Sequence, residues 1–183
     1  MKGVLFNVVE DVVVDQFSEE VWDDVLQRAE LAGAYTTLGN YPDDDLTRIV
    51  GAVCEITGLD VGAVLRFTGQ HAFAHLVGRR ESLLEGIDSW PELLDALDSI
   101  IHPEVMKIYP GAQVPSFTVT GGGERVCLEY RSERGLCELA EGLALGAADW
   151  YAETVTSRHV ACARDGAEAC LIEFVRAEPQ ADA

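Results

Sequence analysis

Apolar positions in the first two thirds of the chain recur mainly at the spacing of an amphipathic helix. Serine, proline and acidic residues, which are favoured in the first turn of a helix, precede these stretches, and glycine follows them. An apolar stretch with inserted acids, 4–15, comes before the first of these starts. The pattern predicts helices that begin at Ser18, Pro42, Asp60 and the capping box Ser89-Trp90-Pro91-Glu92, the last running towards Tyr109.

After Gly111 the pattern changes to short alternating stretches separated by glycine. Residues 116–120 and 125–130 flank three glycines and predict a β-hairpin, and 157–163 with 169–175 predict a second one around Asp165-Gly166. Between the hairpins, 135–154 carries a helical stripe of leucine and alanine. The tail 177–183 has no large apolar side chain, so we expect it to be mobile.

These elements predict an α+β fold, with a helical N-terminal part and a C-terminal antiparallel sheet with helices. No internal repeat or linker divides the sequence, so we expect a single domain, 1–183. A chain of 183 residues buries roughly 70% of its unfolded surface, which leaves room for a cofactor-sized cavity. Its composition, 48% hydrophobic and 25% charged, is that of a globular protein.

The charge balance excludes some partners. A net charge of −19 repels phosphate backbones and anionic membranes, so we expect no nucleic-acid or membrane partner. Glu10 and Asp11 interrupt the first apolar run, and no stretch approaches the ~20 apolar residues of a membrane span. We therefore expect a cytoplasmic protein. Five cysteines without a signal peptide favour free thiols or metal ligands over a disulfide framework.

An isolated histidine, His102, lies near the end of the long helix entered at Ser89 and directly before Pro103. Proline disfavours helical torsions in the residue before it and has no N–H, so we expect a kink or weak point beside this imidazole. A single imidazole on a helix is a suitable ligand for a haem iron. The alternative is that His102 is a hydrogen-bonded core histidine.

A phenol, a hydroxyl and a guanidinium alternate in Tyr130, Ser132 and Arg134. An extended backbone turns alternate residues to one side, where these groups could bind a pair of carboxylates such as the haem propionates. Alternatively, they form a solvated strand end in which Arg134 pairs with Glu133 or Glu138, a contact worth only ~0–1 kcal/mol.

This motif, the opening Met1-Lys2-Gly3 and His102 together resemble the haem nitric oxide/oxygen binding (H-NOX) family, over Met1 to about Arg176. The resemblance implies a haem b held between the helical part and the sheet. His102 would bind the iron, Arg134 would bridge both propionates, and Tyr130 and Ser132 would each donate one hydrogen bond. No Cys-x-x-Cys-His motif is present, so the haem is not covalently attached.

The resemblance also implies a gas sensor rather than an enzyme. Family members that hold oxygen donate to it from a distal tyrosine, and Leu139 occupies that position here. Without a donor the pocket should favour NO, with CO also bound, although a helix rotation could aim His71 inward. The output would pass to a separate histidine kinase or cyclic-di-GMP enzyme. The residues expected around the haem are Leu5, Val9, Ala72, Pro115, Leu139 and Leu143.

A second set of ligands lies near the C-terminus. Three thiols and one imidazole, Cys137, His159, Cys162 and Cys170, form a suitable tetrahedral set for Zn²⁺. Their order also matches the zinc site of some H-NOX proteins. The alternative is that buried cysteines act as small hydrophobic residues, which accounts well for Cys54 and Cys127.

Two other functions are open at this point. In the first, the chain is a zinc and thiol redox sensor, with haem secondary, in which oxidation of the cysteines releases zinc. In the second, it is a haem enzyme such as a peroxidase, for which only His71 and His75 could serve as the distal base. The same two histidines, at i and i+4, could bind a metal, but no third ligand is evident nearby.

Overall fold

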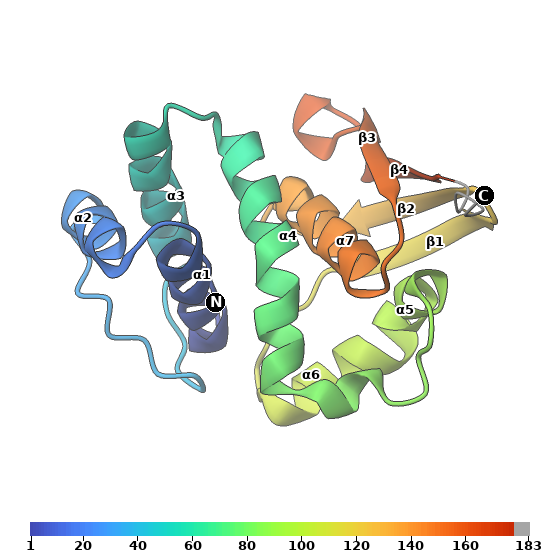
Figure 1. Cartoon of the computed structure of the whole chain (residues 1–183), viewed down its shortest axis with the longest axis horizontal. Coiled ribbons are helices and arrows are strands. Elements are labelled where there is room, and N and C mark those ends of the chain that lie inside the picture. Colours follow the sequence, from blue (N-terminus) through green and yellow to red (C-terminus); the bar gives the residue numbers. More distant parts are fainter. Residues whose placement is uncertain (178–183) are drawn as a thin grey trace, which may run out of the picture.

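The structure, a computed structural model, describes residues 1–177, so the predicted mobile tail beyond Ala177 lies outside the described residues. Figure 1 shows a helical N-terminal part beside a sheet covered by further helices. The helices of the described chain are α1 (Gly3–Gln16), α2 (Glu19–Ala29), α3 (Asp43–Thr57), α4 (Val61–Arg79), α5 (Trp90–Ala96), α6 (His102–Ile108) and α7 (Cys137–Trp150). Short helical turns are η1 (Glu81–Leu84), η2 (Leu97–Ile101) and η3 (Ala163–Asp165). The strands are β1 (Ser116–Gly122), β2 (Arg125–Arg131), β3 (Val155–Ala161) and β4 (Cys170–Arg176).

Three of the four predicted helix starts are confirmed by their caps. Ser18 Oγ accepts the Val21 amide at 3.3 Å, and Asp60 accepts the amide of Ala63 at 3.0 Å. At the capping box, Ser89 Oγ accepts the Glu92 amide at 3.4 Å. These bonds satisfy amide groups that have no partner within the first turn of a helix.

The helix predicted from Ser89 to Tyr109 is interrupted. The π-helical turn η2 separates α5 from α6, and the His102 amide donates to the carbonyl of Leu97. His102 itself keeps helical torsions, with a φ of −64° and a ψ of −41°, and the irregularity expected beside it lies in the π-helical turn directly before it. The missing N–H of Pro103 is instead accommodated by the wider turn that precedes the histidine.

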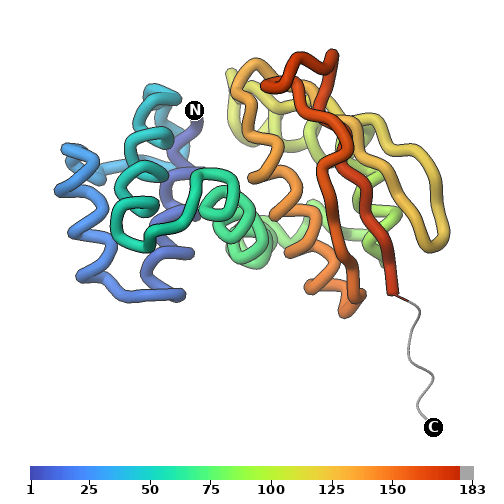
Figure 2. Tube along the Cα trace, turned by 90° about the horizontal axis from the view of Figure 1, so that it is seen from above, coloured from blue at the N-terminus to red at the C-terminus, as the bar shows by residue number. Residues whose placement is uncertain are grey.

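Both predicted hairpins are present in one antiparallel sheet of order β1-β2-β4-β3. β2 and β4 lie in its centre, and β3 has an irregularity between His159 and Ala161. α7 connects the hairpins and packs on the sheet (Figure 2). Within residues 1–177, none of the helices is long and apolar enough to span a membrane.

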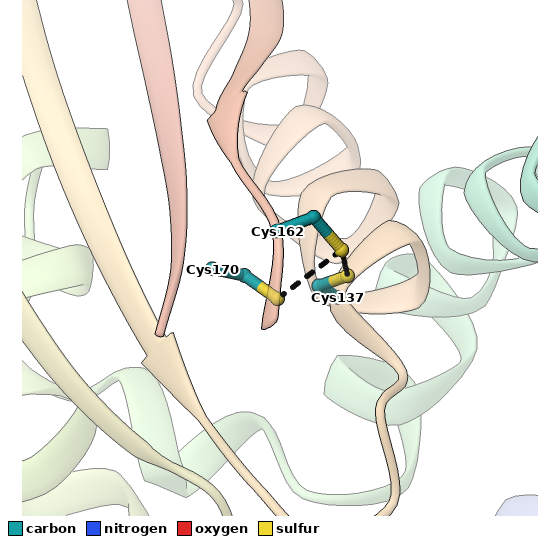
Figure 3. A group of neighbouring side chains, drawn as sticks. All are labelled: Cys137, Cys162 and Cys170. Carbon is teal, nitrogen blue, oxygen red and sulfur yellow. Dashed lines mark hydrogen bonds between the residues drawn. The ribbon is translucent and has the colours of Figure 1, made fainter. Parts of the chain in front are cut away.

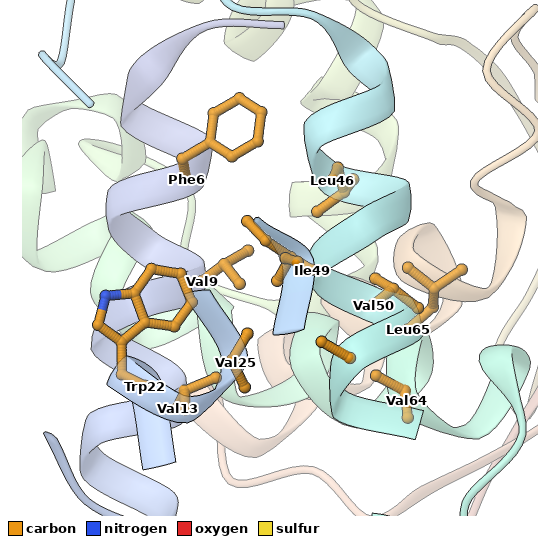
Figure 4. Packing of buried hydrophobic residues seen from close by; sticks show 12 residues of the cluster. Phe6, Val9, Val13, Trp22, Val25, Leu46, Ile49, Val50, Val64 and Leu65 are labelled. Atoms are coloured by element: carbon orange, nitrogen blue, oxygen red, sulfur yellow. The ribbon is translucent and has the colours of Figure 1, made fainter. Parts of the chain in front are cut away.

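Buried side chains form two main cores, one on each side of α4. The N-terminal core lies among α1, α2, α3 and α4 and includes Phe6, Trp22 and Ile49 (Figure 4). The second lies between α5, α7 and the sheet and includes Trp90, whose Nε1 donates to the Ala144 carbonyl at 2.8 Å. The fold class predicted from the sequence is therefore confirmed.

α4 and α7 pack backbone against backbone where glycines face each other. A Cβ atom on Gly142 would lie 2.1 Å from the Arg66 carbonyl oxygen, and one on Gly69 would lie 2.4 Å from that of Leu139. Neither position can take a larger residue unless the helices separate. This close approach joins the two cores.

We expect Gly142→Ala to destabilise the protein, because the new methyl would push α4 away from α7. Overpacking of this kind costs about 1–3 kcal/mol or more. Gly51→Ala is the matched control, since a Cβ at this helical glycine of α3 meets nothing within 4 Å. Alanine should stabilise that helix by up to about 1 kcal/mol. Urea unfolding measures both changes, and equal effects at the two positions would contradict the close packing.

Candidate functional site

The ring of His102 is held by one acidic side chain. Its Nδ1 lies 2.9 Å from Oδ1 of Asp98, and the other oxygen of Asp98 accepts the Phe117 amide at 2.8 Å. The imidazole also stacks on the Phe117 ring, with 5.5 Å between centroids. The turn η2 and strand β1 together therefore fix the direction of the imidazole.

Electrostatics leave His102 suited to bind a metal. Burial lowers the pKa of the imidazole, although the hydrogen bond and charge of Asp98 oppose this. The neutral ring that results donates Nδ1–H to Asp98 and keeps a lone pair on Nε2. Nε2 has no hydrogen-bond partner within residues 1–177. An iron-binding histidine needs such a nitrogen, and its other nitrogen is commonly held by a carboxylate in this way.

The sequence led us to expect an extended backbone throughout the motif Tyr130, Ser132 and Arg134. The structure shows that only its first part is extended. β2 ends at Arg131, and the chain then turns, with Gly135 at a φ of +61°, to enter α7. Tyr130 accordingly belongs to the strand, whereas Arg134 lies in the turn. The alternation predicted from the spacing fails at Arg134 because the chain must reverse before Cys137.

Hydrogen bonds nevertheless connect the motif. The Arg134 amide donates to Ser132 Oγ at 3.3 Å, and the Leu136 amide donates to the Tyr130 phenol at 3.2 Å. Burial raises the pKa of Tyr130, opposed by hydrogen bonds from Ser132 and Leu136. The phenol therefore stays protonated at neutral pH and can donate its O–H to an anion.

The Arg134 guanidinium bridges distant segments. Nε donates to Asp43 Oδ2 at 2.6 Å, and the two terminal nitrogens donate to the carbonyl and side-chain oxygens of Gln113 at 2.7 and 2.9 Å. Asp43 also pairs with the amino group of Met1 at 2.6 Å. The amino group first and Arg134 second lower the pKa of Asp43. Arg134 thus pairs with Asp43 rather than with the neighbouring glutamates considered from the sequence.

Four of the six residues expected to line a haem pocket fall into two groups. Ala72 and Leu143 pack with Val8 and Val12, whereas Val9 and Leu139 belong to the N-terminal core. Leu5 and Pro115 are half-buried. Val8 and Val12 were not among the expected residues, although their spacing from Leu5 places them on the same helix face.

The other two helical histidines are engaged elsewhere. His71 Nδ1 lies 2.9 Å from the backbone carbonyl of Phe67, and the centroids of the His71 and Phe67 rings are 4.1 Å apart. His75 Nε2 lies 3.1 Å from an oxygen of Asp15 on α1. Neither histidine belongs to a potential metal-binding group in the part of the chain that the structure describes.

Three of the predicted zinc ligands meet at one point. The sulfur of Cys162 lies 3.9 Å from that of Cys137 and 3.7 Å from that of Cys170 (Figure 3). A tetrahedral zinc with Zn–S bonds of about 2.3 Å has sulfur–sulfur edges of about 3.8 Å. The thiol spacing therefore fits a zinc ion, which the core-cysteine alternative does not require.

The fourth predicted ligand, His159, lies at the edge of this cluster. It forms a second potential metal-binding group with Cys137 and Glu138 rather than with all three thiols. Glu138, whose carboxylate lies 3.4 Å from the Cys137 sulfur, was missed from the sequence. Burial, followed by hydrogen bonding to Cys170, raises the pKa of the Cys137 thiol to about 12, so this thiol is protonated without a metal.

Tyr130 connects the two candidate sites. It pairs with Cys170 across β2 and β4 and packs with Cys137. On its other side its ring lies 5.7 Å from that of Phe117, which stacks on His102. The histidine, the anion-binding motif and the thiols are therefore parts of one packed region.

Comparisons with known proteins identify the family. The sequence model of the family described as haem-NO-binding matches residues 2–159. The structure is similar to an H-NOX protein from S. oneidensis in the Fe(II)NO ligation state, with a TM-score of 0.90, 29% identity, and coverage of 97% of this chain and 100% of that one. It is also similar to the H-NOX from Shewanella woodyi in the Fe(II)CO ligation state, with a TM-score of 0.80, 30% identity, and coverage of 100% and 97%.

An unliganded Fe(II) H-NOX protein from K. algicida has the same fold, with a TM-score of 0.86 at 24% identity and full coverage of both chains. The resemblance seen in Met1-Lys2-Gly3, His102 and the Tyr130 motif is therefore confirmed at the level of the family. The chain belongs to the haem-NO-binding, or H-NOX, family of haem-based gas sensors.

Proposed function

We propose that this H-NOX domain binds haem b through His102 and acts as an NO-selective sensor that signals to a separate protein. The observation that carries the proposal is the geometry of His102, a largely buried imidazole whose Nδ1 is held by Asp98. Its side chain is 14% exposed, so the ring is oriented by the protein rather than by solvent. Such a ring is prepared to bind iron through Nε2.

The Tyr130 motif would hold the propionates. The haem, when bound, supplies an iron that takes up a diatomic gas. Tyr130 offers its O–H, and Arg134 offers N–H groups beyond the contacts it makes with Asp43 and Gln113. These charge-assisted bonds would anchor the carboxylate edge of the haem beside α7.

Selectivity for NO follows from the apolar side chains around the proposed gas site. Ala72 and Leu143 pack with the valines of α1, and Leu139 provides no hydrogen-bond donor. His71 is held beside Phe67, on its own helix. Bound oxygen gains stability from a donor, whereas NO binds ferrous iron without one, so this pocket should discriminate between them.

The signal would begin at His102. His102 would hold the iron of the bound haem, and it lies between the π-helical turn η2 and Pro103. The π-helical turn lacks the i→i−4 hydrogen bonds of an α-helix, and Pro103 has no N–H to donate. If gas binding at the haem loosened its hold on His102, this segment would relax and alter a surface read by a histidine kinase or cyclic-di-GMP enzyme, the partners that the family resemblance implies.

The thiol cluster would hold one structural Zn²⁺, with Cys137, Cys162 and Cys170 as ligands and His159 as the fourth. The thiol spacing supports this assignment. Neither the fold nor the comparisons favour the alternative of a redox sensor in which haem is secondary.

Absorption spectra of the ferrous protein test the proposed selectivity. NO and CO should each change the spectrum, and air should give no persistent oxygen complex. In Leu139→Tyr, the phenol should stabilise bound oxygen, because a hydrogen-bond donor then reaches the gas site. Leu139→Phe is the control, since it adds the ring without the hydroxyl. A stable oxygen complex in the unmodified protein would contradict the proposal.

A further inference from the structure

A buried carboxylate, that of Glu141, lies between α4, α7 and β3 and belongs to neither proposed site. The residue is 1% exposed. The Ser157 hydroxyl donates to its Oε1 at 2.6 Å. Its Oε2 lies 2.8 Å from Nε of Arg66 and 3.1 Å from Nε2 of His159.

An ionised carboxylate is costly to bury unless charges and hydrogen-bond donors surround it. Glu141 satisfies this condition with groups from two other elements, Arg66 on α4 and the pair Ser157 and His159 on β3. Nε of Arg66, Nε2 of His159 and Oε2 of Glu141 are all buried, and within residues 1–177 none of these three atoms has a partner that meets hydrogen-bond geometry. Both nitrogens nevertheless lie within ion-pair distance of Oε2, which leaves this oxygen as the acceptor for either of them.

This arrangement determines which nitrogen of His159 remains for a metal. Nε2 lies 3.1 Å from the carboxylate oxygen, so the negative charge of Glu141 favours the neutral tautomer that carries its proton on Nε2. Nδ1 then keeps the lone pair. His159 also shares a potential metal-binding group with Cys137, so the imidazole reaches from the carboxylate to the thiol cluster.

We propose that Glu141 is the positioning residue of the zinc site: it accepts Nε2–H of His159 and so presents Nδ1 to the metal. The proposal rests on the zinc site proposed above. Metal-binding histidines typically donate their other N–H to a carboxylate, which fixes the tautomer and the orientation of the ring. Here the carboxylate is itself held by Arg66, so the metal site is tied to α4 as well as to α7.

The tautomer of His159 provides a test that needs no variant of Glu141. In the haem- and zinc-loaded, CO-bound ferrous protein labelled with ¹⁵N-histidine, long-range ¹H–¹⁵N correlations identify the protonated and the coordinated nitrogen. The signal that disappears in His159→Ala belongs to His159. We expect Nδ1 to be coordinated and Nε2 to be protonated. Coordination through Nε2, or no coordination by His159 in zinc-loaded protein, would overturn the proposal.

Zinc affinity provides the second test. Competition with a chromogenic chelator should show about 10–100-fold weaker zinc binding in Glu141→Gln, because the amide is a poorer acceptor for the imidazole N–H. Asp149→Asn is the matched control, since Asp149 also lies on α7 and accepts a hydrogen bond from α4, from Gln70 at 2.7 Å. Its zinc affinity should be unchanged.

A role that acts through His159 must vanish when His159 is absent. In the His159→Ala background, Glu141→Gln should therefore weaken zinc binding no further. An equal loss in both backgrounds would show that Glu141 supports the fold rather than the ligand, and would overturn the proposal. If the unmodified protein binds no zinc, the zinc site itself is wrong. If it binds zinc and Glu141→Gln binds it equally well, only the role of Glu141 is wrong.

Discussion

His102→Gly protein is expected to be purified nearly free of haem and to take up haem only when imidazole is supplied. The variant removes the iron ligand and leaves a space that free imidazole can fill. Asp98 remains and can accept a hydrogen bond from the added imidazole as it does from Nδ1 of His102. Haem content measured by absorption should therefore be near background without imidazole and near stoichiometric with it.

A matched control separates ligation from general damage to a helix. His71→Ala replaces a helical histidine that contacts Phe67 and should retain its haem without added imidazole. Normal haem content and an unchanged ferrous spectrum in His102→Gly would contradict the assignment of His102. Loss of haem in His71→Ala as well would point to the fold of the helices rather than to the ligand.

Cys162→Ala is expected to lose the zinc and much of the stability of the C-terminal part. The sulfur of Cys162 lies between those of Cys137 and Cys170, so its removal opens the cluster. The fold brings the ligands together, so zinc binding contributes to folding free energy. A loss of even about 2 kcal/mol would lower the melting temperature by about 4–8 °C in a domain of this size. Elemental analysis and thermal unfolding measure the two effects.

Cys127→Ala is the control for this experiment. Cys127 lies in β2, is a free cysteine, and does not belong to the thiol cluster. Its substitution should leave the zinc content unchanged. Zinc-free protein whose cysteines all react freely with a thiol reagent would contradict the site and leave only the core-cysteine interpretation.

Helix starts could be predicted because their signals are local. Ser18, Asp60 and Ser89 cap amides three residues later, so a short stretch of sequence contains both partners. The π-helical turn before His102 could not be predicted in the same way. Proline indicated an irregularity, but whether it falls at the histidine or one turn earlier depends on packing beyond the helix, including the contact of Asp98 with Phe117.

For the candidate site, the residue types could be proposed from the sequence, but their surroundings could not. The spacing of Tyr130, Ser132 and Arg134 indicated anion binding, yet the partner of Arg134 is Asp43, which lies 91 residues away in the sequence. The thiols were found from their number and order. Glu141 was not singled out from the sequence, although its position gives an indication. An acidic residue among the alanines and glycines of an apolar helix is expected to be buried and therefore to need a charged or hydrogen-bonding partner.

The central claim, that His102 binds the haem iron, is tested most directly by resonance Raman spectroscopy of the unliganded ferrous protein. We expect an iron–imidazole stretching band in the unmodified protein. In His102→Gly with imidazole added, a band should return and should shift when the imidazole is replaced by its ¹⁵N-labelled form. An iron–imidazole band that persists in His102→Gly without added imidazole would show that another histidine binds the iron and would contradict the claim.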